Sequence, residues 1–103
     1  MSREMSYRPL PEEVTIGKSE VEGLGLFATM DLKEGDCLGI SHNVINGILH
    51  RTPLGGFYNH SDTPNMEKID TDLNDTRTVF RLHIIKDVKK GEELTCDYSF
   101  YKI

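Results

Sequence analysis

The chain has 103 residues, of which 37% are hydrophobic and 28% charged, and its net charge is −5 at pH 7. That length suits one domain near the lower limit for a single hydrophobic core. No apolar run approaches the ~20 residues of a membrane helix, residues 1–11 lack a secretory pattern, and no basic stripe marks a duplex-binding protein. We expect an intracellular protein, cytoplasmic or nuclear, that binds neither membranes nor nucleic acid directly. Its acidic charge suits a basic partner or simple solubility, and charge alone does not distinguish these.

The first half of the chain contains short strand-like segments separated by glycine-containing turns. Residues 1–13 are polar and are expected to form an extended leader before a domain at 14–103. Alternating apolar and polar residues predict strands at 14–18 and 26–28, and a further short strand at 36–40.

The second half continues in the same way. We predict a strand at 44–49, followed by a loop or a single helical turn, and then an irregular segment at 58–65. A brief strand at 66–69 precedes a polar turn at 70–76. The clearest strand is 78–85, with Phe80, Leu82 and Ile84 on one face, and a last strand covers 94–98. No segment has a helical period over ten residues, so the fold class is mostly β.

Two segments of the chain resemble each other. Residues 30–36 and 86–92 each follow a predicted strand, contain a similar Asp-x-Lys-x-Gly pattern and precede another strand. We interpret them as the same turn chemistry used twice, and they are too short and too far apart for a solenoid.

The two cysteines, Cys37 and Cys96, have no closely spaced partners. Together with the four histidines they form no zinc-binding spacing, so no metal site is predicted. Two free thiols in a reducing compartment are expected rather than a disulfide.

Three short motifs carry candidate chemistry. Residues 23–28 match the dinucleotide-binding pattern G-x-G-x-x-A, but the turn that follows at once ends any helix, so that interpretation fails. The two glycines indicate either close backbone approach to a ligand or a plain turn. The polar segment 58–65 can bind a polar ligand or cap its own backbone. Tyr98, near the end of the motif at 91–98, suits either a core position or a catalytic hydroxyl.

Taken together, the motifs resemble a known family. The order Gly-x-Gly-Leu-Phe-Ala at 23–28, Asn-His-Ser-x-x-Pro-Asn at 59–65 and Gly-Glu-Glu-Leu-Thr-x-Asp-Tyr at 91–98 is similar to that of the SET domain. The resemblance implies a β-clip-like fold of several small curved sheets with a C-terminal pseudoknot. Segments 57–65 and 94–98 are therefore expected to lie side by side. It also implies protein-lysine N-methyltransferase activity with S-adenosylmethionine as cofactor.

The resemblance assigns roles to particular residues. Gly23, Leu24 and Gly25 are expected to meet the methionyl part of the cofactor through their backbone. Asn59 would bind its amino group, and the backbone of His60 would contact the adenine. No metal is needed for this reaction.

The acceptor side is assigned in the same way. Tyr98 matches the catalytic tyrosine, and the His60 ring would brace it. The lysine channel is expected to be lined by Tyr58, Cys96, Phe100 and Tyr101. Cys96 stands where the family has a Phe or Tyr that limits methylation, so the resemblance implies that more than one methyl group can be added to the lysine.

The sequence also departs from the family. Only 99–103 follow the last motif, where many relatives have a Cys-rich zinc segment that completes the lysine channel, and the segment at 40–56 is short. The chain is similar in these respects to small stand-alone viral members, so a homodimer of viral or microbial origin is expected. The substrate would be a histone tail or another lysine-bearing protein. The alternative is a catalytically inactive SET-like module that binds a peptide.

Overall fold

The computed structural model describes residues 10–21 and 23–97. Within these ranges the chain forms short strands and one single-turn 3-10 helix, in agreement with the predicted mostly β class. The elements are β1 (Val14–Lys18), β2 (Leu24–Ala28), β3 (Cys37–Ile45), β4 (Ile48–Arg51), η1 (Pro53–Gly55), β5 (Asn59–His60), β6 (Met66–Asn74), β7 (Arg77–Ile84) and β8 (Glu93–Cys96).

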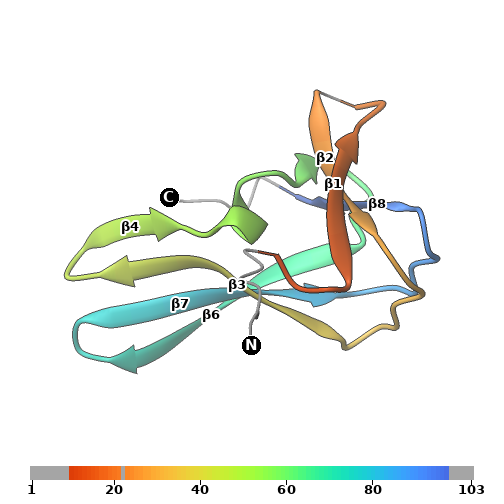
Figure 1. Ribbon diagram of the computed structural model, residues 1–103. Helices are drawn as coiled ribbons and strands as arrows, with labels where there is room; N and C mark the ends of the chain where they lie inside the picture. Colours follow the sequence, from red (N-terminus) through yellow and green to blue (C-terminus); the bar gives the residue numbers. More distant parts are fainter. Residues whose placement is uncertain (1–9, 22, 98–103) are drawn as a thin grey trace, which may run out of the picture.

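The strands form one continuous hydrogen-bonded path in the order β1-β2-β8-β6-β7-β3-β4, and β5 also pairs with β8. Most pairs are antiparallel, whereas β5 and β6 both run parallel to β8. In Figure 1 the β1–β2 hairpin stands across the direction of the long β3–β4 and β6–β7 hairpins. Strand β8 therefore joins two differently oriented parts of the fold.

The hydrophobic core lies around β8. Leu94, Thr95 and Cys96 are all buried, because β8 has neighbours on both edges and both faces. The core cluster consists of Val14, Leu26, Ala28, Leu32, Leu38, Leu54, Tyr58, Met66, Leu82, Ile84, Val88, Leu94 and Cys96.

The described end of the predicted leader, residues 10–13, packs against the domain and is not separate from it. Leu10 packs against the core cluster, and the backbone of Thr29 donates a hydrogen bond of 2.9 Å to the carbonyl of Glu13. The described part of the predicted leader therefore contacts the domain. Residues 1–9 lie outside the described ranges, and the boundary at residue 14 stays a prediction.

The predicted strand at 44–49 is wrong, because the chain reverses in its middle. Asn46 (φ 51°) and Gly47 (φ 79°) form a two-residue turn that joins β3 to β4. Both φ angles are positive, as a type I′ hairpin turn requires, and Asn-Gly is the preferred sequence for it. The dipeptide was the signal that the interpretation as one strand overlooked.

The predicted polar turn at 70–76 is also mostly wrong. Strand β6 continues to Asn74, and Asp70, Thr71 and Asp72 pair with β7. These positions are polar because they are exposed and not because the chain turns. Only Asp75 and Thr76 connect the two strands.

The predicted faces of β7 are correct at one end of the strand and differ at the other. Leu82 and Ile84 are buried on the expected face, but Phe80 is only half-buried. Val79, on the opposite face, is fully buried. Strand β7 is therefore covered on both faces near Val79 and Leu82. The ring of Phe80 lines a pocket that is described below.

The two similar turns pair with each other. Leu32 and Val88 form an isolated β-bridge with reciprocal hydrogen bonds of 2.8 and 2.9 Å. Gly35 (φ 98°) donates its amide to Ile84, and Gly91 (φ 92°) donates its amide to Ala28 in the equivalent way. The predicted repeat of turn chemistry is confirmed, and the copies are related by a local two-fold arrangement.

Reciprocal aspartates reinforce this arrangement. Asp31 accepts a hydrogen bond of 2.9 Å from the amide of Lys90, and Asp87 accepts one of 3.0 Å from the amide of Glu34. Each turn therefore uses its aspartate to cap the other turn. The bridging residues of the two turns, Leu32 and Val88, are buried in the core cluster.

Candidate functional site

The second and third motifs meet at β8. Asn59 and His60 in β5 lie beside Thr95 and Cys96 in a parallel pair, and the amide of Ser61 donates to the carbonyl of Cys96 at 3.2 Å. The expected side-by-side placement of 57–65 and 94–98 is confirmed for the described residues. More than thirty residues of chain separate these strands, so the arrangement is tertiary in origin.

The amide side chain of Asn65 stabilises this contact between segment 59–65 and β8. Its Nδ2 donates to the carbonyl of Glu93 at 2.9 Å, and its Oδ1 accepts from the amide of Thr95 at 2.9 Å. A carboxamide satisfies one donor and one acceptor of a strand edge at once. Asn65 is therefore a structural member of the motif that holds the β8 backbone.

A second amide, that of Asn59, faces the first motif. Its Nδ2 donates to Glu93 Oε2 at 2.8 Å and to the carbonyl of Leu24 at 3.2 Å. Ser19 Oγ donates to both carboxylate oxygens of Glu93 at 2.8 Å. The three segments that carry the motifs therefore converge on one carboxylate, which we call the Glu93 cluster: Ser19, Leu24, Gly25, Asn59 and Glu93.

Glycine is required at the centre of this cluster. A Cβ atom on Gly25 would overlap Glu93 Oε2 and lie 3.1 Å from Asn59 Nδ2. Gly23 adopts a positive φ of 43°, and its carbonyl accepts from the amide of Ser19 at 2.8 Å. Gly23, Leu24 and Gly25 are thus brought to Asn59 by close backbone approach, and their contact with a cofactor stays a prediction.

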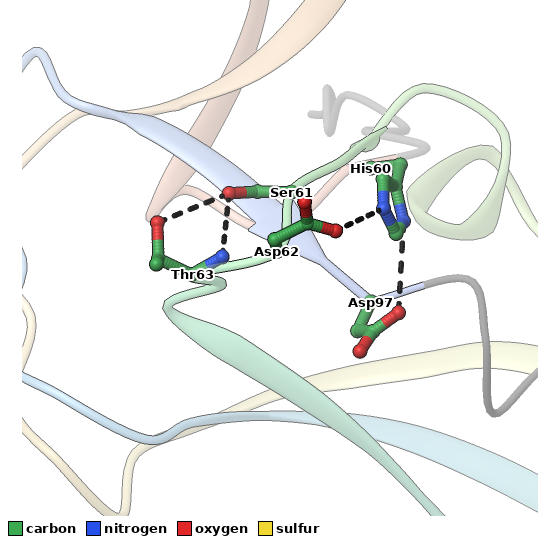
Figure 2. Close-up of polar contacts among 5 residues, drawn as sticks. All are labelled: His60, Ser61, Asp62, Thr63 and Asp97. Carbon is green, nitrogen blue, oxygen red and sulfur yellow. Dashed lines mark hydrogen bonds and ion pairs between the residues drawn. The ribbon is translucent and has the colours of Figure 1, made fainter.

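His60 lies between two carboxylates (Figure 2). Its Nε2 is 3.1 Å from Asp62 Oδ1, and its Nδ1 is 3.7 Å from Asp97 Oδ1. Its expected contact with Tyr98 involves a residue outside the described ranges. Among the described residues, these carboxylates orient the ring.

The polar segment 58–65 has several roles at once. Figure 2 shows Ser61 turned toward Thr63, whose amide donates to Ser61 Oγ at 3.0 Å. That bond caps the local backbone, whereas Asn59 and Asn65 reach other strands. Capping of the local backbone is therefore observed within this segment, and binding of a polar ligand stays a prediction.

A pocket of about 420 Å³ lies on the other side of β8, next to β6 and β7. It is lined by Pro64, Met66, Glu67, Lys68, Asp70, Phe80, Ile85, Cys96 and Asp97. Cys96 therefore lies at a cavity, and its place in a lysine channel stays a prediction. Tyr58 is buried in the core cluster and is not part of this lining, while Phe100 and Tyr101, like Tyr98, lie outside the described residues.

Two ionisable groups in this pocket are shifted by their surroundings. Burial lowers the pKa of Lys68 from 10.5 to about 8. Burial also raises the pKa of the Cys96 thiol, so this thiol is protonated at neutral pH. Burial is the largest cause of both shifts, and it favours the neutral form of each group.

Sequence reasoning missed Glu93, Ser19 and Lys68. Glu93 belongs to the motif at 91–98, but the sequence assigned it no role. It reaches Asn59 only because β2 and β5 both pair with β8. Lys68 lies in a predicted strand and was assigned no role. A possible signal was its place two residues after Met66 on a predicted strand, which puts both side chains on one face.

The described residues offer neither a metal-binding cluster nor a disulfide. No group of three or more His, Cys, Asp or Glu side chains suited to a metal ion occurs among residues 10–21 and 23–97. Cys37 is an exposed free thiol, and Cys96 is a buried one. In the described part of the chain, no helix is long and apolar enough to span a membrane.

Comparison with known proteins agrees with the geometry. The family model described as SET domain matches residues 40–99, more than half of the chain. No curated protein matches the sequence. Residues 23–28, with the first motif, lie outside the matched range but belong to the same cluster.

Solved structures share the fold. A candidate histone methyltransferase from Plasmodium falciparum is 24% identical with a TM-score of 0.72, over 86% of this chain and 95% of that one. A humanized mutant of the Chaetomium thermophilum Polycomb Repressive Complex 2 bound to an inhibitor is 24% identical with a TM-score of 0.70, over 85% of this chain. The Chaetomium complex in an autoinhibited conformation bound to S-adenosylmethionine is 22% identical, with a TM-score of 0.68 over 85% of this chain. This chain spans only 15% of either Chaetomium chain.

Proposed function

This chain belongs to the SET domain family, and on that premise we propose that it is a protein-lysine N-methyltransferase that uses S-adenosylmethionine. The observation that carries the proposal is the Glu93 cluster, in which residues from three distant segments converge beside the β5–β8 crossing. A polar cluster of this kind, built on a glycine that admits no side chain, suits recognition of a small polar ligand.

The residues of the cluster fit one end of this cofactor. Its α-ammonium group needs hydrogen-bond acceptors and a compensating charge, and the cluster offers the Glu93 carboxylate and the Leu24 carbonyl. Since Asn59 directs Nδ2 to those acceptors, it presents Oδ1 on the opposite edge of its amide. When bound, S-adenosylmethionine supplies a methyl group activated by the sulfonium. A relative with this fold has been solved bound to it.

The pocket beside Cys96 suits the acceptor. A lysine amine must be neutral to act as a nucleophile, and its ordinary pKa is ~10.4. Met66, Phe80 and Cys96 provide weakly polar walls, which favour the neutral form. We place the acceptor amine here, and its alignment in the pocket would supply much of the rate enhancement.

Tyr98 is proposed as the catalytic hydroxyl that orients this amine. Support comes from its two preceding residues, because Cys96 and Asp97 both line the pocket. The small Cys96 side chain leaves room beside the acceptor, so we propose that di- or trimethyllysine can form. Phe100 and Tyr101 are proposed to complete the channel.

The substrate is proposed to be a lysine-rich protein segment, of which a histone tail is one example. The net charge of −5 favours a basic partner, and proteins of this fold include histone methyltransferases by name. We further propose a homodimer, as in small viral members, and a cytoplasmic or nuclear location. The pseudoknot at the C-terminus and the domain range 14–103 belong to the same proposal.

The test is a methyl-transfer assay with labelled S-adenosylmethionine on histones and on whole-cell lysate. Tyr98→Phe is the catalytic variant, and calorimetric binding of S-adenosylhomocysteine is measured in parallel. We expect transfer by the wild-type chain, a large loss in Tyr98→Phe, and similar binding by both. Binding without transfer to any protein would favour an inactive peptide-binding module, and absence of binding would refute the proposal.

A further inference from the structure

Lys68 directs its amine into the pocket beside Cys96. Strand β6 passes β8 where Met66 pairs with Cys96, and Lys68 follows two residues later on the same face. Its Nζ atom is fully buried and lies 5.5 Å from the centroid of the Phe80 ring. Lys68 and Cys96 are close enough that each affects the titration of the other. The chain therefore carries a lysine of its own in this cavity.

The surroundings of this amine favour the reactive form. Burial lowers the pKa of Lys68 to about 8. At a pH equal to this pKa, about half of the Lys68 side chains are neutral. An ordinary surface lysine, with a pKa of ~10.4, is neutral in well under one molecule in a hundred at the same pH. A neutral amine has the lone pair that a methyl acceptor requires.

We propose that Lys68 is itself a methyl acceptor, so that the protein modifies its own chain from within the pocket that it offers to substrate lysines. The inference rests on the methyltransferase activity proposed above. In the step, the lone pair of neutral Nζ forms a bond to the methyl carbon of the sulfonium donor. The carbon–sulfur bond breaks with its electron pair on sulfur, and the secondary ammonium that results can lose its proton to water.

The pocket also suits the product. A methylated amine regains a positive charge when protonated and becomes larger and less hydrated with each methyl group. The Phe80 ring can hold such a cation by a cation–π contact, and the carboxylates of Glu67, Asp70 and Asp97, which also line the pocket, can complement its charge. Retention of methylated Lys68 in the cavity is therefore favourable.

The first measurement locates the modification. The purified full chain is incubated with S-adenosylmethionine at pH 8, digested and sequenced by mass spectrometry, beside Lys68→Arg and the control Lys86→Arg. Lys86 is exposed and donates to the carbonyl of Thr63 at 3.3 Å. We expect methylation of Lys68 in the wild type and in Lys86→Arg, and loss of that signal in Lys68→Arg. Methylation at other lysines alone would overturn the inference.

A dilution series distinguishes modification within one chain from modification between chains. Because Nζ already lies in the pocket of its own chain, the fraction modified per unit time should not change with protein concentration. A rate per chain that rises in proportion to concentration would contradict the proposed geometry.

Two further readouts do not depend on turnover. Titration of chain labelled with ¹³C at the lysine ε carbon, without cofactor, should reveal one lysine with a pKa near 8 that is absent from Lys68→Arg. A pKa of ~10.4 for Lys68 would contradict the burial of its amine in the pocket. Calorimetry with S-adenosylhomocysteine separates the two proposals. If the wild type binds and Lys68 stays unmodified, only this inference fails, whereas absence of binding refutes the proposed function itself.

Discussion

At the scale of single residues, Glu93 links the first and second sequence motifs. Its carboxylate accepts from both Asn59 and Ser19, and these bonds hold the Asn59 amide in one of its two orientations. Asn59 came from a motif match, whereas Glu93 is assigned by contact alone. We regard Glu93 as a positioning residue whose charge also complements an ammonium.

Replacement of Glu93 by Gln tests this role. The neutral amide removes the charge and frees Asn59 to rotate, so the Kd for S-adenosylhomocysteine should rise roughly 10- to 100-fold, as for loss of a charged hydrogen bond. Calorimetry measures the change. The Kd for 5′-methylthioadenosine, which lacks the amino-acid part, should stay within about twofold of the wild type.

Glu92→Gln is the matched control, because Glu92 accepts from the amide of Lys89 within a turn and lies away from the cluster. Equal weakening by both substitutions, or equal weakening for both ligands, would show that Glu93 acts on stability and not on the amino-acid end.

His42 makes stability depend on pH. The ring is fully buried, packs edge-on to Phe80 and places Nδ1 2.9 Å from Ser41 Oγ. Because Ser41 donates to the carbonyl of Phe80, Nδ1 carries the hydrogen of the neutral ring. Burial, aided by the charges of Lys68 and Arg51, lowers the pKa of His42 from 6.5 to about 4.

Acid should therefore weaken the fold as the pH falls below 6.5. Below pH 6.5 the unfolded chain binds a proton that the folded chain does not accept until about pH 4, so stability is lost across this window as pH falls. The loss approaches about 3 kcal/mol at pH 4. Urea unfolding between pH 7 and 4.5 measures the loss, which His42→Asn should largely abolish. The exposed His50→Asn should leave it unchanged, and an unaltered slope in His42→Asn would assign the loss elsewhere.

At the scale of elements, the paired turns act as one unit. Asp31 caps the amide of Lys90 and Asp87 caps that of Glu34, across a bridge between Leu32 and Val88. The two turns therefore stabilise each other and not only the hairpins to which they belong.

The hydrogen bonds of Asp31 and Asp87 should contribute equally to the free energy of unfolding, because each caps one amide of the other turn. Asp31→Ala and Asp87→Ala should each lower the free energy of unfolding by about 1 kcal/mol, since each leaves one amide without its carboxylate partner. Thermal unfolding of the two variants measures this, with Asp75→Ala, in the exposed turn between β6 and β7, as the control. Strongly unequal losses would show that the symmetry is geometric and not energetic.

At the scale of the whole molecule, the contact between segment 59–65 and β8 joins parts of the chain that lie far apart in sequence. Asn65 supplies two hydrogen bonds to β8 across about thirty residues of chain, and it lies between the Glu93 cluster and the pocket. Stability and ligand binding should therefore fail together when this amide is lost.

Asn65→Ala should lower the free energy of unfolding by about 2–4 kcal/mol, because two part-buried backbone groups lose their partners. Chemical denaturation measures the loss, and calorimetry should detect weaker binding of S-adenosylhomocysteine. Asn74→Ala removes an amide that accepts only from Thr76 in an exposed turn and should cost about 1 kcal/mol or less. Similar losses in both variants would contradict a special role for the crossing.

Several features could be predicted from the sequence because they depend on nearby residues or on whole motifs. The alternation at 14–18 predicted β1 with its observed bounds, and the repeated Asp-x-Lys-x-Gly pattern predicted two like turns. The motif order indicated the family and brought Gly25, Asn59 and Cys96 into consideration. The hairpin at Asn46-Gly47 was also within reach, although the interpretation overlooked it.

Apart from the neighbouring segments 57–65 and 94–98, which the family resemblance implied, only the tertiary structure decided which segments meet. Local pattern does not encode strand partners, since a period of two specifies faces and not neighbours. The approach of Glu93 to Asn59, the bridge between the two turns and the extension of β6 through polar residues all depend on such pairing. The same holds for Lys68, whose amine becomes buried and loses basicity because β6 passes β8 beside Cys96.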